Sequence, residues 1–483
     1  MWSRTWQKTQ KLSFRKALNI YLNNFMQDLS HIHKEQKEFF DSKKTIPIKF
    51  RKESLRRLSK SIKNNEEKIY NALEKDLGKP RYETFLSEIL FVQKEIKIML
   101  KKIDYWSKPK RVQSSIYSFP SKDYILPSPF GCVLNISPWN YPFQLAMSPL
   151  IGAIAAGNTV VLKPSEHSPN TSLVIKNVIE DSFDTGHATT VLGDAKEAQE
   201  LLSFRWDYIF FTGSTIVGKI VARAAAEFLT PTTLELGGKS PCIVDESVNI
   251  NLTAKRIVWG KFLNCGQTCI APDYILVNEK IKNKLITAMK EAIINSYGKN
   301  AKESKSYGRI VNENHLNRIN KMIENADIIH GGKSDLKSKY FEPTIISDQE
   351  LKSGAMKEEI FGPILPIISY ADMDEVYNII NRYDKPLAAY IFSKSNKKIT
   401  DFKNNFSAGA IVANDSIIQV INSNLPFGGI GNSGIGAYHG QHSFDLFTHF
   451  KPFIKRSFTP DPYIRYAPYP KKWSFIKKIL EYL

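Results

Sequence analysis

Cysteine is scarce in this chain, and its spacing is irregular. The 483 residues include four cysteines, at positions 132, 242, 265 and 269. Small secreted domains that depend on disulfides carry more cysteines at regular spacings. The first residues also lack the short apolar segment of a secretory signal. A disulfide scaffold is therefore excluded, and the sequence predicts a protein of the reduced cytoplasm.

Long apolar runs are also missing. The most apolar stretch, residues 145–162, is interrupted by Pro149, Gly152, Gly157 and Asn158. It falls short of the roughly 20 consecutive apolar residues that cross a membrane, so a multi-span membrane protein is excluded. With 42% hydrophobic and 24% charged residues, the chain has the composition of a folded globular protein. Its length predicts about two to four domains.

Acidic residues are few at both ends of the chain. The whole sequence has 67 basic and 48 acidic side chains, a net charge of +19. Residues 1–25 and 449–483 together carry eleven of these nineteen charges. A nucleic-acid-binding protein concentrates Lys and Arg on a recognition element of the folded body. Terminal charge fits an anionic membrane surface or solubility better, and we expect no nucleic-acid partner.

The order of apolar and polar residues predicts an α/β fold. Residues 34–106 have a helical pattern, with apolar side chains at three- and four-residue steps between Phe85 and Leu100. From Gly131 onward, β-rich apolar runs alternate with helical runs in two successive sets. Strands are expected at 132–136, 159–162, 208–211, 241–244 and 274–277, and helices at 146–156, 171–181, 218–226, 252–263 and 281–297. Such alternation predicts parallel sheets with crossover helices, in two α/β domains.

A nucleophile is one interpretation of the segment 262–272, Phe-Leu-Asn-Cys-Gly-Gln-Thr-Cys-Ile-Ala-Pro. Gly266 and Pro272 mark a tight passage that can present a side chain to a cleft. A structural zinc site needs about four ligands, and no matching Cys or His pair lies elsewhere in the sequence, so no metal is expected. A pair of small buried thiols is the other interpretation. A nucleophile needs a thiolate, an oxyanion donor and a proton acceptor.

Candidates for those two further groups exist. Asn140, in Ser-Pro-Trp-Asn-Tyr-Pro after an expected strand, could aim its amide at a developing oxyanion, or could simply cap a helix. Glu235, in Leu-Glu-Leu-Gly-Gly-Lys, lies between an apolar run and two glycines. There its pKa could be raised for general-base work, or it could be a solvated acid at a strand end.

A phosphate site is suggested less specifically. The segment Phe211-Thr-Gly-Ser-Thr-Ile-Val-Gly218 follows an expected strand and opens an expected helix. It lacks both G-x-G-x-x-G and a P-loop ending. Backbone N–H groups at such a turn can still face an anion, and an ordinary strand-to-helix connection is equally compatible.

Together these segments resemble the aldehyde dehydrogenase superfamily. The resemblance extends from about Gly131 to Gly440 and is most specific in the order of its motifs. Residues 259–276 and 426–440, and Arg465-Tyr-Ala-Pro-Tyr-Pro470, look like class 3, the fatty and aromatic aldehyde dehydrogenases. The resemblance implies NAD(P)-dependent oxidation of an aliphatic, medium- or long-chain, or aromatic aldehyde to the acid.

Residue roles follow from the resemblance. It implies that Cys269 is the nucleophile, Glu235 the general base and Asn140 the oxyanion donor, with Cys265 structural. The cofactor-binding residues that it implies are Trp139, Lys163, Glu166, Gly213, Ser214, Gly218, Glu359 and Phe361. Glu166 would accept from both ribose hydroxyls and repel a 2′-phosphate, so we expect NAD with some use of NADP.

Domain limits and partners are expected on the same ground. They are a Rossmann-like cofactor domain (26–111 and 127–236), a catalytic domain (237–440), and a β oligomerisation extension that pairs 112–126 with 445–460 and forms a homodimer. Residues 1–25 would be a basic extension from an upstream start codon or a targeting segment. Residues 471–483 would be a basic amphipathic tail that lies on a membrane or caps the body or the substrate entrance.

Two other functions remain for comparison. An acyl-activating reductase would make an aldehyde, but Glu235 favours attack of water on a thioester. A basic binding protein on an enzyme-derived fold would not need the complete set of catalytic residues.

Overall fold

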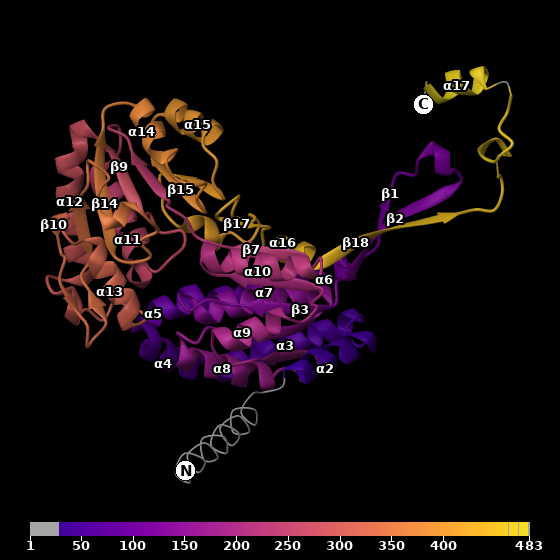
Figure 1. Cartoon of the computed structure of the whole chain (residues 1–483), viewed down its shortest axis with the longest axis horizontal. Coiled ribbons are helices and arrows are strands. Elements are labelled where there is room, and N and C mark those ends of the chain that lie inside the picture. Colours follow the sequence, from indigo (N-terminus) through magenta and orange to yellow (C-terminus); the bar gives the residue numbers. More distant parts are fainter. Residues whose placement is uncertain (1–28, 462, 472, 482–483) are drawn as a thin grey trace, which may run out of the picture.

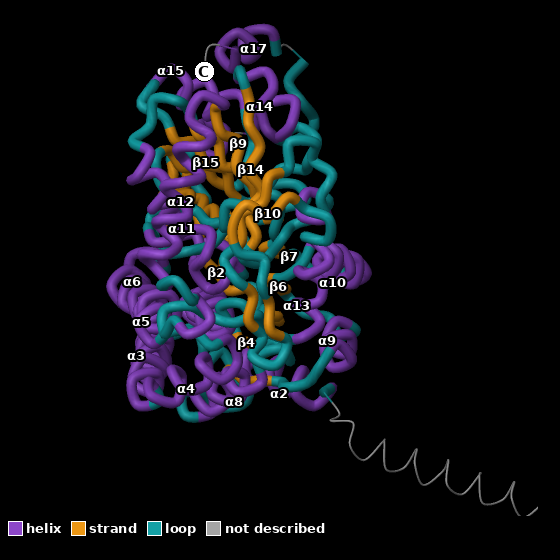
Figure 2. Tube along the Cα trace, turned by 90° about the vertical axis from the view of Figure 1, so that its left-hand side faces the viewer, coloured by secondary structure: helices purple, strands orange, loops and turns teal. Residues whose placement is uncertain are grey.

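A computed structural model describes residues 29–461, 463–471 and 473–481. It has two α/β lobes and an arm that projects from the first lobe (Figure 1). Figure 2 shows the two sheets one above the other, with helices on their outer sides. The predicted extension at residues 1–25 lies outside the described residues. The α/β class that the alternation predicted is confirmed.

The first lobe is built on a six-stranded sheet of order β17-β7-β6-β3-β4-β5. Its strands are β3 (Cys132–Ile136), β4 (Thr159–Lys163), β5 (Ala188–Thr190), β6 (Tyr208–Thr212), β7 (Thr232–Glu235) and β17 (Gly434–Ile435). All neighbours are parallel except β17, which pairs with β7 antiparallel. Residues 434–435 lie in the range predicted for the catalytic domain, so the chain returns to the first sheet after the second lobe.

Helices cover this sheet. They are α2 (Ser30–Asp41), α3 (Ile48–Asn64), α4 (Glu66–Leu77), α5 (Arg81–Thr84), the π-helical turn η1 (Phe85–Ile89), α6 (Leu90–Trp106), α7 (Pro142–Ala156), α8 (Pro169–Glu180), α9 (Ala195–Leu202), α10 (Thr215–Glu227) and α16 (Gln441–Leu446). Every residue of α7 is buried. The apolar stretch 145–162 is therefore a core helix followed by the buried strand β4. No helix in the described ranges is long and apolar enough to span a membrane.

The second lobe contains a seven-stranded sheet of order β10-β13-β14-β9-β8-β15-β16. Its strands are β8 (Pro241–Val244), β9 (Tyr274–Asn278), β10 (Asp327–His330), β13 (Thr344–Ser347), β14 (Ile364–Tyr370), β15 (Ala388–Phe392) and β16 (Ala410–Ala413). A small hairpin joins β11 (Ser334–Asp335) to β12 (Tyr340–Phe341). The helices are α11 (Ile250–Phe262), α12 (Lys282–Tyr297), α13 (Glu313–Met322), α14 (Met373–Ile380) and α15 (Asn396–Asn405). Short 3-10 turns include η3 (Leu263–Gly266).

The arm is a three-stranded antiparallel sheet of order β1-β2-β18. It comprises β1 (Lys110–Val112), β2 (Ser121–Pro129) and β18 (Thr448–Arg456), with Pro129 opposite Thr448. The expected pairing of 112–126 with 445–460 thus has different strand limits here. β2 extends to Pro129 because the ladder with β18 continues to the lobe.

The last described helix is α17 (Ser474–Glu481), beyond the arm and apart from both lobes (Figure 1). Within one chain it therefore does not cap the body. Leu483 and the side chains of Ile476, Ile479 and Leu480, on which the predicted apolar face depends, lie outside what the structure describes.

Candidate active site

The candidate site begins where two neighbouring strands of the first sheet end. After β3 the chain continues along β4 and β5 on one side, and it returns on the other side as β6. This reversal of strand order leaves a crevice at the carboxyl ends of β3 and β6, which is where open α/β sheets bind ligands. The loop 137–141 follows β3, and Gly213 and Ser214 follow β6. The sheet topology thus brings these two predicted segments together.

Asn140 is buried in the loop after β3. Its Nδ2 donates to the Gln267 carbonyl at 3.0 Å, across from the loop that carries Cys269. The N-cap residue of α7 is Tyr141 and not Asn140, and the Tyr141 side chain makes no capping hydrogen bond. The simple helix-cap alternative for Asn140 is therefore wrong. A primary amide has a second N–H, which is available to a reacting oxygen.

The loop that carries Cys269 is shaped by a tight reversal after α11. Asn264, Cys265 and Gly266 have φ values of 51°, 57° and 73°, in the left-handed region. A Cβ at Gly266 would lie 2.3 Å from the Gly362 carbonyl oxygen, so only glycine fits this approach. Cys265 is fully buried in the core, whereas Cys269 is partly exposed. The turn therefore presents only the second thiol.

Burial raises the pKa of the Cys269 thiol, and the nearby carboxyl groups of Glu359 and Glu235 raise it further. Burial also raises the pKa of Glu235 well above its ordinary value. Glu235 ends β7, and neither carboxyl oxygen has a hydrogen-bond partner among the described residues. A solvated acid at a strand end is therefore the wrong description of Glu235. A carboxyl group with a raised pKa is suited to exchange protons near neutral pH.

One cavity of about 920 Å³ collects most of the predicted residues. Its lining includes all three candidates for catalysis and five for cofactor binding: Asn140, Glu235, Cys269, Trp139, Gly213, Ser214, Glu359 and Phe361. These residues come from both lobes, and the cavity therefore lies between the two sheets.

The cofactor end of this cavity fits a dinucleotide. Ser214 caps α10, and the N-terminal N–H groups of a helix at a glycine turn favour a phosphate. Gly237 leaves room for Glu359, since a Cβ there would lie 2.1 Å from its carboxyl oxygen. Burial, with Asp273 nearby, raises the pKa of Glu359 to about 8. Glu359 can accept a hydrogen bond from a ribose hydroxyl, and Phe361 packs edge-on against Trp139 at 5.3 Å.

The loop that carries Glu359 is held by a buried ion pair. Lys239 Nζ lies 2.6 Å from Asp273 Oδ2 and donates to the carbonyls of Ala355 and Glu358. Asp273 Oδ1 accepts from the backbone N–H of Ile360 at 3.1 Å. These contacts fix the backbone on both sides of Glu359.

Three predicted cofactor residues are not brought into this cavity. Lys163 donates to Glu166 Oε2 at 3.2 Å and to the Gly193 carbonyl at 2.7 Å, beyond the end of β4. Burial tends to raise the pKa of Glu166. The backbone N–H of Glu166 and the nearby Lys163 outweigh that effect and hold this pKa below its ordinary value. Gly218 is buried within α10, where a Cβ would lie 2.7 Å from Leu236 Cδ2. It allows the helix to approach β7 closely.

The rest of the cavity wall was not predicted from the sequence. It is largely aromatic and aliphatic and includes Tyr82, Leu86, Phe91, Tyr141, Trp259, Tyr297, Phe427 and Tyr438. It also contains Glu83, whose pKa burial raises to about 7. Tyr141, Trp259, Phe427 and Tyr438 lie in segments that carry the resemblance, but no role was predicted for them. Tyr82, Leu86, Phe91 and Tyr297 come from α5, η1, α6 and α12, and no motif marks them. In the described ranges no group of three or more His, Cys, Asp or Glu side chains could hold a metal ion.

Comparisons with known proteins identify the family. The profile of the aldehyde dehydrogenase family matches residues 24–453. The chain is 47% identical over 445 residues to 4,4′-diaponeurosporen-aldehyde dehydrogenase of Staphylococcus aureus, covering 92% of this chain and 97% of that protein. It is 44% identical to aldehyde dehydrogenase family 3 member A2 of Pongo abelii, covering 87% of each. It is 42% identical to the dimeric NADP-preferring aldehyde dehydrogenase of Rattus norvegicus, covering 92% and 99%.

The fold has a similar solved structure. A substrate-bound Staphylococcus aureus aldehyde dehydrogenase superposes with a TM-score of 0.92 at 46% identity, covering 94% of this chain and 100% of that one.

Proposed function

The chain belongs to the aldehyde dehydrogenase family and catalyses NAD(P)-dependent oxidation of an aldehyde, and from this premise we propose that Cys269, Glu235 and Asn140 carry out the reaction. The observation that supports these roles best is the shared cavity, in which a partly exposed thiol, an unpartnered buried carboxyl group and a fixed amide come together. The thiol attacks, the amide stabilises the oxyanion, and the carboxyl group handles protons.

The steps follow from the groups present. Cys269, once deprotonated, attacks the aldehyde carbon and forms a thiohemiacetal. The Asn140 amide and the Cys269 backbone N–H donate to its oxyanion. The dinucleotide, when bound, supplies the acceptor for the hydride. Loss of that hydride leaves a thioester on Cys269. Glu235 then takes a proton from the water that attacks the thioester, and the carboxylic acid leaves.

Cofactor contacts divide between two places. Trp139, Gly213, Ser214, Glu359 and Phe361 line the cavity and would hold the pyrophosphate and the nicotinamide ribose. Lys163 and Glu166, outside it, would meet the adenosine ribose. The Glu166 carboxylate supports a preference for NAD, because it repels a 2′-phosphate.

The substrate is proposed to be a medium- or long-chain aliphatic aldehyde, or an aromatic one. The aromatic and aliphatic side chains in the wall of the cavity that contains Cys269 favour such a substrate over a small polar aldehyde. Oxidation is favoured over reduction of an activated acid, because Glu235 lies in the same cavity as the thiol and promotes attack by water.

The decisive experiment is NADH formation measured by absorbance over an aldehyde chain-length series. We expect kcat/KM to rise with chain length, because each buried methylene contributes about 0.8 kcal/mol. Cys269→Ser is the control and should turn over at least about a thousandfold more slowly. Fluorescence titration should show that this variant still binds NAD. Near-normal turnover by Cys269→Ser would overturn the assignment of the nucleophile.

The assembly is proposed to be a homodimer through the arm, with residues 26–111 and 127–236 as the cofactor domain and 237–440 as the catalytic domain. β18 is an edge strand, and an unpaired edge with exposed apolar side chains favours pairing. We also propose a cytoplasmic enzyme whose basic tail, 471–483, contacts anionic membranes. Unchanged liposome binding after deletion of 471–483 would contradict the membrane contact.

A further inference from the structure

A buried ion pair lies behind Asn140. Lys79 follows the left-handed Gly78 at the end of α4, and Glu88 lies in the π-helical turn η1. Both side chains are 0% exposed, and Lys79 Nζ is ion-paired with Glu88 Oε1. Taking two charges out of water is costly, and such a pair is weak evidence for stability by itself. Its contacts therefore decide what it does.

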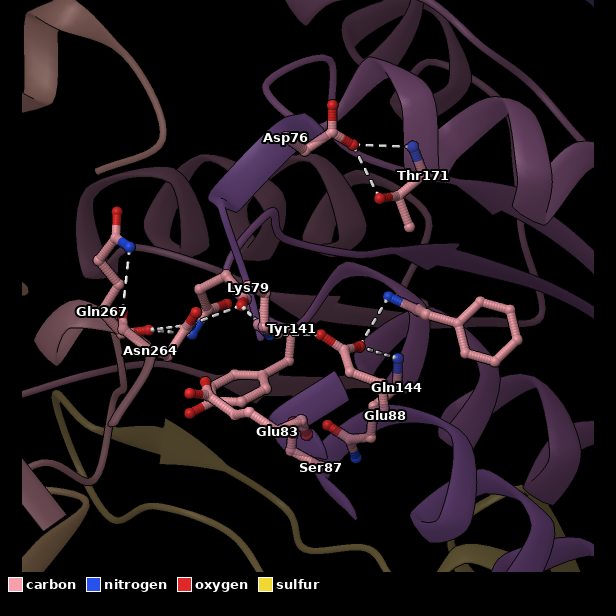
Figure 3. A network of polar contacts seen from close by, with 12 residues as sticks. Asp76, Lys79, Glu83, Ser87, Glu88, Tyr141, Gln144, Thr171, Asn264 and Gln267 are labelled. Atoms are coloured by element: carbon pink, nitrogen blue, oxygen red, sulfur yellow. Dashed lines mark hydrogen bonds and ion pairs between the residues drawn. The ribbon is translucent and has the colours of Figure 1, made fainter. Parts of the chain in front are cut away.

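Those contacts converge on the segment 140–144 (Figure 3). Glu88 Oε2 accepts from the backbone N–H of Phe143 at 3.1 Å and of Gln144 at 2.9 Å, in the first turn of α7. Lys79 Nζ donates to the Asn140 carbonyl at 3.2 Å and lies 4.1 Å from the centre of the Tyr141 ring. The pair thus holds the backbone of residue 140 and the start of the helix after it.

The other side of Asn140 is held by the nucleophile loop. Asn264 Nδ2 donates to the same Asn140 carbonyl at 2.7 Å. Gln267 accepts from the Asn140 amide through its carbonyl, and its own side chain bonds the carbonyl of Asn264 and the backbone N–H of Val311. Asn140 is therefore fixed between the Lys79–Glu88 pair and the loop that presents Cys269.

We propose that Lys79 and Glu88 are positioning residues that hold the Asn140 amide at the reacting oxygen. The inference rests on the proposed role of Asn140 as the oxyanion donor. Donors of this kind act because they are fixed before the reaction begins. Losing the pair frees the 140–144 backbone, so the step that forms the oxyanion and releases the hydride slows, while dinucleotide binding is unaffected.

The test uses Glu88→Gln, Lys79→Met and the double variant Lys79→Met/Glu88→Gln in the full chain. The matched control is Asp76→Asn, which lies three residues before Lys79. Asp76 is buried and accepts from the backbone N–H groups of Asn170 and Thr171 at the start of α8, as Glu88 does at α7, but it does not contact Asn140. Each variant is mixed with saturating NAD and aldehyde, and the NADH burst is recorded. The amplitude of the burst reports the number of active sites. The rate constant of the burst therefore describes the folded, active enzyme, even where a variant folds less completely.

We expect the double variant to slow the burst by about tenfold to a hundredfold with an unchanged Kd for NAD. Asp76→Asn should keep the wild-type burst rate. Glu88→Gln alone leaves a buried lysine unpaired and lowers the thermal midpoint. The double variant should recover much of the thermal midpoint but should keep the slow burst. If the pair had only a structural role, the midpoint and the burst rate would recover together.

A double-mutant cycle with Asn140→Ala completes the test. If the pair acts through Asn140, its loss adds no further slowing in the Asn140→Ala background. Two outcomes overturn this inference and leave the proposed function intact. One is full additivity of the effects of the pair and of Asn140→Ala on the burst rate. The other is a wild-type burst rate in Lys79→Met/Glu88→Gln when Asn140→Ala alone is slow. A wild-type burst in Asn140→Ala overturns the oxyanion role and this inference with it.

Discussion

At the scale of single residues, the site shifts the pKa values of its acid groups upward. Burial raises the pKa of Glu235, and burial with neighbouring carboxyl groups raises those of Cys269 and Glu359. A protonated thiol is a poor nucleophile. Under the proposed roles, ionisation of Cys269 and ionisation of Glu235 are expected to limit different steps as the pH changes.

The first prediction concerns Glu235 and pH. A general base must be ionised, and its pKa is raised, so deacylation should accelerate as pH rises through that raised pKa. Glu235→Gln should slow thioester hydrolysis by about 10²–10⁴-fold and flatten this dependence. Steady-state turnover and single-turnover NADH release, measured from pH 6 to pH 9, separate deacylation from hydride formation. An unchanged deacylation rate would contradict the base role.

The second prediction concerns Glu95 and stability. Glu95 is buried on α6 and accepts from the Gly440 backbone N–H, and burial raises its pKa from 4.5 to about 7. The folded state therefore binds a proton that the unfolded state releases, so stability falls as pH rises from about 4.5 to 7. Glu95→Gln should keep the hydrogen bond and raise the free energy of unfolding at pH 8 by about 1–3 kcal/mol. At pH 4.5 thermal midpoints of the two proteins should coincide.

At the scale of elements, three of the predicted site residues lie at the ends of buried strands or in the short loops after them. β3, β6 and β7 are wholly or largely buried and end at Asn140, Ser214 and Glu235 or just before them. The expected strands 132–136 and 241–244 match β3 and β8 residue for residue, since their apolar runs are bounded by turn residues. The helical pattern predicted between Phe85 and Leu100 is divided between the π-helical turn η1 and α6, and Glu88 in η1 contacts the start of α7.

A third prediction concerns the loop after β4. Glu166 is partly exposed there, next to Lys163. Glu166→Ser removes the charge that repels a 2′-phosphate, so the ratio of kcat/KM for NADP to that for NAD should rise about tenfold. Both cofactors are compared at a fixed aldehyde concentration. Glu180→Ser, which removes an exposed acid farther along α8, is the control and should not change the ratio. If the wild type and Glu166→Ser have the same NADP-to-NAD ratio, the proposed role of Glu166 in selecting the cofactor is contradicted.

At the scale of the whole molecule, the arm sets the expected assembly. It leaves the first lobe as a three-stranded sheet, and Phe450, Phe453 and Ile454 on β18 are 44%, 46% and 58% exposed. Apolar side chains on an exposed edge strand mark an interface. The basic side chains of the described C-terminal residues lie on β18 or after it in the chain, and none of them lines the cavity.

The fourth prediction tests this interface. Ile454→Lys buries a charge in the proposed contact and should convert the dimer to a monomer, as measured by light scattering after size-exclusion chromatography. Leu336→Lys is the control, because Leu336 is 43% exposed on the second lobe and far along the chain from the arm. A dimer that survives Ile454→Lys would move the interface elsewhere.

The sequence by itself determined the fold class and the family, and it predicted the residues that are proposed to react. Periodicity and motif order carry that information locally, and Cys269, Glu235 and Asn140 each follow a strand or turn that their neighbours define. Only the tertiary structure decided that Glu83, Trp259, Tyr297 and Tyr438 share one cavity with them. It also decided that Lys79 and Glu88 meet behind Asn140. Both arrangements depend on packing between segments that are far apart in the chain. A local sequence pattern does not indicate which distant side chains will pack together and exclude water.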